Sequence, residues 1–125
     1  VGTGSRLLLA FLDDKQIAVY IEKFSPFTKI TPRTLTQPEE IWEEVHLVRS
    51  RGFARGYEDH STGANYLAFP VFSALKRPLA AIIIGGPNDV FTHERADELI
   101  PVIQPVIDEL NQHSRVFPAV PLVKF

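Results

Sequence analysis

Apolar residues recur at two periods along this chain, and each period predicts a type of secondary structure. Residues 37–51 form one such segment. Its apolar members Ile41, Val45 and Val48 are spaced like the stripe that a helix turns toward a core. A longer stripe follows Thr92, a residue suited to cap a helix; its members are Ala96, Leu99, Ile100, Ile103, Ile107 and Leu110. We predict a helix over each segment.

Polar residues mark both ends of the first of these helices. Thr36 and Glu39 have the spacing of a capping box, in which each side chain bonds to the other residue's backbone amide. Acidic side chains crowd the first two turns and complement the positive end of the helix dipole; they are Glu39, Glu40, Glu43 and Glu44. Gly52 follows the last turn, where a glycine commonly ends a helix.

Three other segments are apolar over strand-sized lengths, at residues 53–57, 65–72 and 79–84. The second carries apolar side chains on both of its alternating faces, which predicts a sheet covered on both sides. Pro70 within it has no amide to donate and predicts an edge position or a bulge. The run Gly85-Gly86-Pro87 is expected to end the third strand.

Two shorter apolar segments, 5–12 and 16–23, predict further helices, and the prolines within 24–33 indicate an irregular connection. The elements together predict an α+β fold, with a mostly antiparallel sheet flanked by helices.

The composition narrows the class of protein. With 45% hydrophobic and 22% charged residues, the chain is expected to fold rather than remain disordered. Its longest apolar run is strand-sized, so we expect no membrane span. A net charge of −2 gives no basic footprint for nucleic acid. Methionine is absent even at position 1, so further sequence is expected before Val1. No signal-peptide pattern opens the chain, which favours the cytoplasm.

The usual signatures of catalysis and metal binding are missing from the sequence. No cysteine is present, and the four histidines do not stand at metal-ligand spacing. No serine lies in the G-x-S-x-G pattern of a nucleophile elbow. We therefore predict no catalytic residue, no metal site and no cofactor.

Two motifs connect the chain to a known family. Residues 32–41 match the pattern P-x-T-L-T-x-P-E-x-[IL], and residues 48–54 match V-R-x-R-G-[FY]-A. Together with Val71 and Phe72, they resemble the C-terminal effector-binding domain of the IclR family of bacterial transcriptional regulators, from about Gly2 to Gln112.

The resemblance implies a GAF-like fold that lacks the first part of its domain. Residues 1–112 would be that partial domain, and residues 113–125 an apolar tail that packs on the domain or on a partner. The family further implies a small-molecule effector, a homo-oligomer (dimer or tetramer), and operator DNA contacted only through a winged helix-turn-helix that precedes this chain.

The family's effector pocket maps onto six positions here. They are Thr3, Gly4, Gly56, Tyr66, Ile83 and Gly85. Several depart from the family pattern: Gly56 replaces an Asp or Ser, Tyr66 a small residue, and Ile83 and Gly85 a pair of serines. Asp59 and Ser73 are departures too, replacing a Glu and an Asp or Asn. With the pocket acid and both serines gone, a small hydroxy or keto acid would lack hydrogen-bond partners.

Two explanations of these departures are open. The pocket takes a larger, flatter and less polar ligand, with Gly56 and Gly85 leaving room and Tyr66 offering a ring and a hydroxyl. Alternatively, Tyr66 fills the cavity and the domain is a GAF-like dimerisation or interaction module that senses nothing. An unrecognised enzyme is the third reading and lacks a visible nucleophile–base pair.

Overall fold

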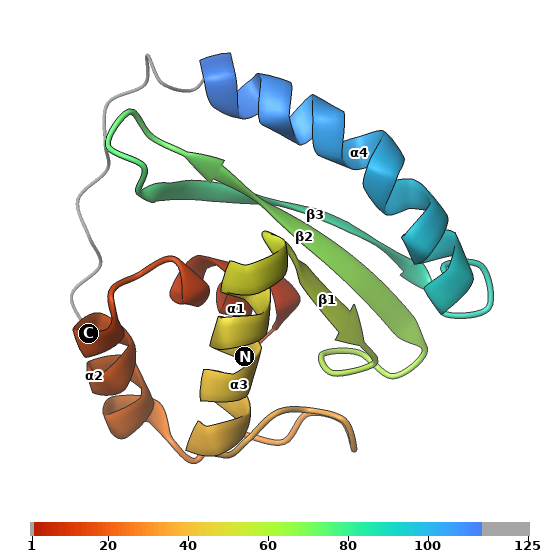
Figure 1. Cartoon of the computed structure of the whole chain (residues 1–125). Coiled ribbons are helices and arrows are strands. Elements are labelled where there is room, and N and C mark those ends of the chain that lie inside the picture. Colours follow the sequence, from red (N-terminus) through yellow and green to blue (C-terminus); the bar gives the residue numbers. More distant parts are fainter. Residues whose placement is uncertain (1, 114–125) are drawn as a thin grey trace.

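The computed structural model describes residues 2–113 of the chain and contains four helices and three strands over that range (Figure 1). In chain order these are α1 (Thr3–Ala10), α2 (Asp14–Phe24), α3 (Pro38–Arg51), β1 (Ala54–Tyr57), β2 (Ala64–Phe72), β3 (Pro78–Pro87) and α4 (His93–His113). Apart from His113, the predicted apolar tail lies outside the described residues.

The three strands form one antiparallel sheet in the order β1-β2-β3, with α1 and α3 on one face and α4 on the other (Figure 1). Alternate side chains of β2 point to opposite faces of the sheet. Ala68 is buried in the core cluster built by α1, α2 and α3. Leu67 and Phe69 are buried in a second cluster with Ala96 and Ile107 of α4. The predicted α+β class, and a sheet covered on both sides, are confirmed.

The start of α3 lies one residue later than the predicted capping box. The side chain of Glu40, not Glu39, accepts hydrogen bonds from the backbone amides of Gln37, at 3.1 Å, and Thr36, at 3.3 Å. The Thr36–Glu39 pairing was therefore wrong. Pro38 is the first helical residue, a position that suits its fixed φ, and this makes Glu40 the third residue of the helix. At the other end Gly52 stops the helix with φ 87°, as predicted.

The first two helices begin two residues earlier than predicted. Gly2 precedes α1, and the helix is complete by Ala10. Asp13 caps α2, since its Oδ1 accepts a hydrogen bond from the Gln16 amide at 2.8 Å. In α4, Thr92 is the predicted cap, and its hydroxyl accepts from the Arg95 amide at 3.1 Å.

The third strand is longer than predicted, because Gly85, Gly86 and Pro87 do not end it. They continue the ladder opposite Tyr66, Asn65 and Ala64. The glycines can extend like any residue, and a proline is tolerated as the last residue of a strand.

Pro70 lies where β2 has lost one neighbour, as its missing amide suggested. β1 begins at Ala54, opposite Ala68, so beyond Ala68 the strand β2 is paired with β3 alone among the described strands. On the side of β2 that β1 does not reach, the Asn111 side chain of α4 bonds to the strand backbone. It donates to the Pro70 carbonyl at 2.9 Å and accepts from the Phe72 amide at 2.7 Å. The irregularity in the ladder falls between Val71 and Phe72.

None of the helices in residues 2–113 is both long and apolar enough to span a lipid bilayer.

Candidate functional site

Three of the predicted pocket residues form a row across the sheet. Tyr66 of β2 lies opposite Gly56 of β1 on one side and Gly85 of β3 on the other. The Tyr66 ring rests on the glycine of β3: a Cβ atom at position 85 would lie 2.4 Å from Cδ1 of the ring. Any side chain larger than hydrogen at Gly85 would therefore displace the ring.

The N-terminus of α1 lies next to this row. Residues at the start of α1, in β2 and in β3 line a cavity of about 430 Å³ that is open to solvent. The residues that line the cavity are Gly2, Thr3, Gly4, Ser5, Leu8, His60, Tyr66, Ala81 and Ile83. Four of the six predicted positions are among them: Thr3, Gly4, Tyr66 and Ile83. Gly56 and Gly85 stand behind the lining.

The room expected at the two glycines is already occupied by neighbouring side chains. At Gly85 it is taken by the Tyr66 ring. At Gly56, a Cβ atom would lie 2.0 Å from the Thr3 hydroxyl oxygen and 2.9 Å from Oδ1 of Asp59. These glycines therefore admit protein side chains, and the free volume lies nearer to the start of α1.

The start of α1 gives the cavity its electrostatic character. The first amides of a helix, here those of Thr3, Gly4 and Ser5, have no acceptor within the helix. The N-cap residue Gly2 has no side chain to cap them, and no acidic residue lies in the first turn of the helix. Because the N-terminal end of a helix carries partial positive charge, this end favours a carboxylate or another anion.

The opposite wall of the cavity is apolar. Ile83 of β3 is 54% exposed and lies beside Gly4, where an added Cβ would meet the Ile83 Cδ1 atom at 2.5 Å. Ala81 and Leu8 extend the same wall. A ligand body that covers Ile83 would remove apolar surface from water.

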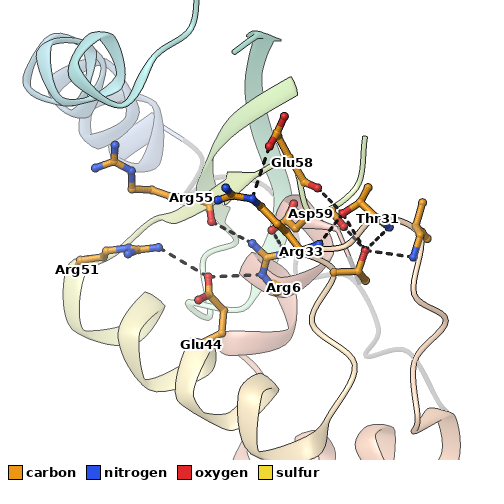
Figure 2. Close-up of polar contacts among 10 residues, drawn as sticks. Arg6, Thr31, Arg33, Glu44, Arg51, Arg55, Glu58 and Asp59 are labelled. Carbon is orange, nitrogen blue, oxygen red and sulfur yellow. Dashed lines mark hydrogen bonds and ion pairs between the residues drawn. The ribbon is translucent and has the colours of Figure 1, made fainter. Parts of the chain in front are cut away.

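A largely buried ionic network joins α1, α3 and the turn after β1 (Figure 2). Arg6 of α1 is 2% exposed; one of its nitrogens pairs with Asp59 Oδ2 at 2.7 Å, and another donates to the Arg55 carbonyl at 3.0 Å. Glu44 of α3 lies 3.5 Å from Arg6 Nε and 3.7 Å from Arg51. Burial lowers the pKa of the Arg51 guanidinium, and the nearby Glu44 carboxylate partly offsets this. The network ties α1 and α3 to the turn after β1.

The turn itself is held by the connection between α2 and α3. The Thr34 hydroxyl donates to the Asp59 carbonyl at 2.7 Å, and the Thr31 hydroxyl donates to the carbonyl of Glu58. Arg6 holds the carboxylate of Asp59 and Thr34 holds its backbone carbonyl, so both the side chain and the main chain of Asp59 are fixed.

Sequence reasoning placed neither Asp59 nor His60 at the site. His60 lines the cavity beside Gly2. Asp59 reaches Gly56 only because the chain turns back after β1, and the polar run between two strands was the one signal for that turn. The part of the chain that the structure describes holds no group of three or more His, Asp or Glu side chains able to bind a metal ion.

Residues 2–111 match the family described as bacterial transcriptional regulator IclR C-terminal. The chain therefore belongs to the IclR family, as its C-terminal effector-binding domain, and the relatives it matches are transcriptional regulators. It is 31% identical over 97 residues to the transcriptional repressor IclR of Escherichia coli K12, covering 78% of this chain and 35% of the repressor. The chain thus spans about a third of that relative.

Solved structures confirm the fold. A transcriptional regulator from Rhodococcus sp. RHA1 superposes with a TM-score of 0.84 at 26% identity, over 93% of this chain and 47% of that one. The inducer-binding domain of the transcription factor PobR from Acinetobacter, a double mutant in complex with 3-hydroxybenzoic acid, superposes with a TM-score of 0.80 at 24% identity. That match covers 88% of this chain and 63% of the other. At that identity the likeness concerns the fold alone.

Proposed function

We propose that this chain is the ligand-sensing part of a DNA-binding transcriptional regulator, and that its effector is a small organic molecule bulkier or less polar than a small keto acid. The regulator acts as a homo-oligomer, a dimer or tetramer, in the cytoplasm. It contacts its operator through a winged helix-turn-helix outside this chain. Ligand binding shifts the balance between two arrangements of the oligomer, which requires a different affinity for each.

The observation that carries this proposal is the open cavity between the start of α1 and Ile83. Its volume of about 430 Å³ lies within the range of small-molecule sites, roughly 300 to 1,000 Å³. Tyr66 lines this cavity with its ring set against Gly85, so a filled pocket is the less favoured of the two explanations.

The two walls of the cavity suggest the two halves of the effector. An anionic group such as a carboxylate would be bound by the amides of Thr3 and Gly4 at the positive end of α1. A flat apolar body would lie against Tyr66 and Ile83. The aromatic acid bound by the PobR domain has this combination of groups, which makes hydroxybenzoates suitable first probes.

A dimerisation or interaction module without an effector is the second candidate, and one surface favours it. Val102 and Val106 lie one turn apart on α4 and are 66% and 63% exposed. The helix prolines Pro101 and Pro105 are exposed beside them. Exposed apolar side chains grouped in this way are typical of a protein contact.

A thermal-melt screen distinguishes the candidates. The chain is heated with aromatic acids, sugar acids, small keto acids and neutral aromatics, each in large excess. A ligand at 100 times its Kd stabilises the folded state by about 2.7 kcal/mol, which raises Tm by several degrees. We expect a shift with aromatic acids and none with small keto acids. A shift with keto acids alone would contradict the proposed ligand class, and no shift with any compound would favour the interaction module.

A further inference from the structure

The wall of the cavity at the start of α1 carries one side chain that can become positively charged near neutral pH. Among the nine described residues that line the cavity, this side chain is His60, since a histidine gains its charge between pH 5 and 8. His60 is exposed, so its imidazole ring is accessible to a bound molecule. Its geometry alone places it at the site, because the family motif did not point to this position.

His60 lies beside the backbone that begins α1. A Cβ atom added to Gly2, the N-cap residue, would lie 3.7 Å from Nδ1 of His60 and 3.8 Å from its Cγ atom. These are ordinary contact distances, so the imidazole ring lies next to Gly2. The amides of Thr3 and Gly4 follow directly in the chain. An anionic group bound by these amides would therefore also lie near the imidazole.

The charged groups around His60 are occupied elsewhere. The lining residues of α1 and β3 carry no charged side chain. The two acidic neighbours of His60 in the turn after β1 have other partners: Asp59 pairs with Arg6 at 2.7 Å, and Glu58 accepts from the Gly63 amide at 2.9 Å. Figure 2 shows Asp59 beside Arg6. Within residues 2–113, neither carboxylate pairs with the imidazole, which leaves the ring for a ligand.

Electrostatics favours an anion between the imidazole and the start of the helix. The N-terminal end of a helix carries partial positive charge, and a protonated histidine carries a full one. These two positive charges repel each other, whereas an anion between them attracts both. Both ring nitrogens of a protonated imidazole are hydrogen-bond donors, and such a bond to a carboxylate is charge-assisted.

We propose that His60 is a ligand-binding residue of the cavity, which in its protonated form binds the anionic group of the effector together with the amides at the start of α1. This inference rests on the proposed function and narrows it: the effector is an anion, and the domain binds it more tightly as the pH falls. Binding also takes up a proton, because the bound anion favours the charged imidazole.

The test is a calorimetric titration of the full chain with 3-hydroxybenzoate at pH 5.5 and pH 7.5. A carboxylic acid with an ordinary pKa, near ~4, is ionised at both values, so the ligand keeps its charge. We expect an affinity about three- to fivefold higher at pH 5.5, a modest factor because water screens a pair made by an exposed side chain. Titrations at pH 6.5 in two buffers with different ionisation enthalpies should show proton uptake on binding.

Matched variants assign these effects to one residue. His60→Gln keeps a hydrogen-bonding side chain without the charge, and should bind equally at the two pH values and take up no proton. His60→Lys, which is charged at both values, should bind tightly at both. His46→Gln is the control, since His46 lies on α3, stacks on Trp42 and is not among the lining residues. It should keep the native pH dependence.

Each outcome bears on a different statement. Equal affinity of the native chain at pH 5.5 and 7.5 overturns this inference and leaves the proposed function standing. A pH dependence that persists in His60→Gln, or one that His46→Gln also abolishes, overturns the role of His60. No binding at either pH overturns the proposed ligand class and this inference with it.

Discussion

The two faces of strand β2 are built from neighbouring residues but for different purposes. On the α4 face, Leu67 and Phe69 are buried and meet Phe91 and Ile107 in a closed apolar cluster. On the α1 face, Tyr66 lies between two glycines under an open cavity, with buried charged groups beneath it. A strand whose side chains alternate can therefore supply packing on one face and a binding site on the other.

The difference between the faces teaches where stability and function should separate. On the α4 face, large apolar side chains pack closely against one another in a buried cluster. On the α1 face, small residues allow close approach of α1, and some buried polar atoms, such as Oδ1 of Asp59, have no hydrogen-bond partner among the described residues. Substitutions on the first face should change the free energy of unfolding, and those on the second should change ligand affinity.

The largest expected effect is on the α4 face. Phe69 is fully buried, and Phe69→Ala should lower the free energy of unfolding by about 3 to 5 kcal/mol, measured by urea denaturation. Val102→Ala, on the exposed side of α4, is the control and should cost less than about 0.5 kcal/mol. A loss below about 1 kcal/mol at Phe69 would show that this cluster is not closed.

A smaller loss is expected at Asn111, which joins α4 to the open side of β2. Asn111→Ala leaves the Phe72 amide and the Pro70 carbonyl without this partner and should cost about 1 to 3 kcal/mol. The matched control is Gln104→Ala, because within residues 2–113 that amide bonds only to exposed Asp108. Urea denaturation of both variants measures the difference, and equal losses would contradict the role given to Asn111.

Tyr66→Ala should affect binding more than folding. Loss of the ring from the cavity wall is expected to lower the affinity for an aromatic acid at least tenfold, or by about 1.4 kcal/mol, as measured by calorimetry. The free energy of unfolding should fall by less than it does for Phe69→Ala, because Tyr66 is only partly buried. The opposite pattern, a large loss of stability with unchanged binding, would support the filled-pocket module.

The smallest effect on stability is expected at Gly4. Alanine improves helix propensity by up to about 1 kcal/mol, but its Cβ would press on the end of the Ile83 side chain. Because that side chain is flexible and half exposed, Gly4→Ala should leave Tm nearly unchanged while altering ligand affinity. Adding Ile83→Val, which removes the Cδ1 atom in contact, should restore affinity; failure to do so would place the ligand elsewhere.

Periodicity was enough to predict the helices, the strands and the covering of both sheet faces. The stripe Ile41, Val45 and Val48 is buried as expected. Element ends were less predictable, because they depend on single contacts. Glu40 rather than Glu39 caps α3, and the third strand continues through Gly86 because Asn65 lies opposite it.

The candidate site was only partly predictable. The family motif led to Thr3, Gly4, Tyr66 and Ile83, which line one cavity. It could not reveal that Asp59 occupies the space beside Gly56, because that placement depends on Arg6 and Thr34, which are distant in sequence. A motif compares residues position by position, whereas a site is filled by whichever side chain reaches it.

The most direct test of the two-face arrangement is an amide chemical-shift titration of the full chain with 3-hydroxybenzoate, read by NMR. We expect the shifts to concentrate at Thr3, Gly4 and Ser5, with smaller ones at Tyr66 and Ile83, and α4 to stay unchanged. Shifts centred on α4, or none at saturating ligand, would contradict the assignment of the binding site to the α1 face.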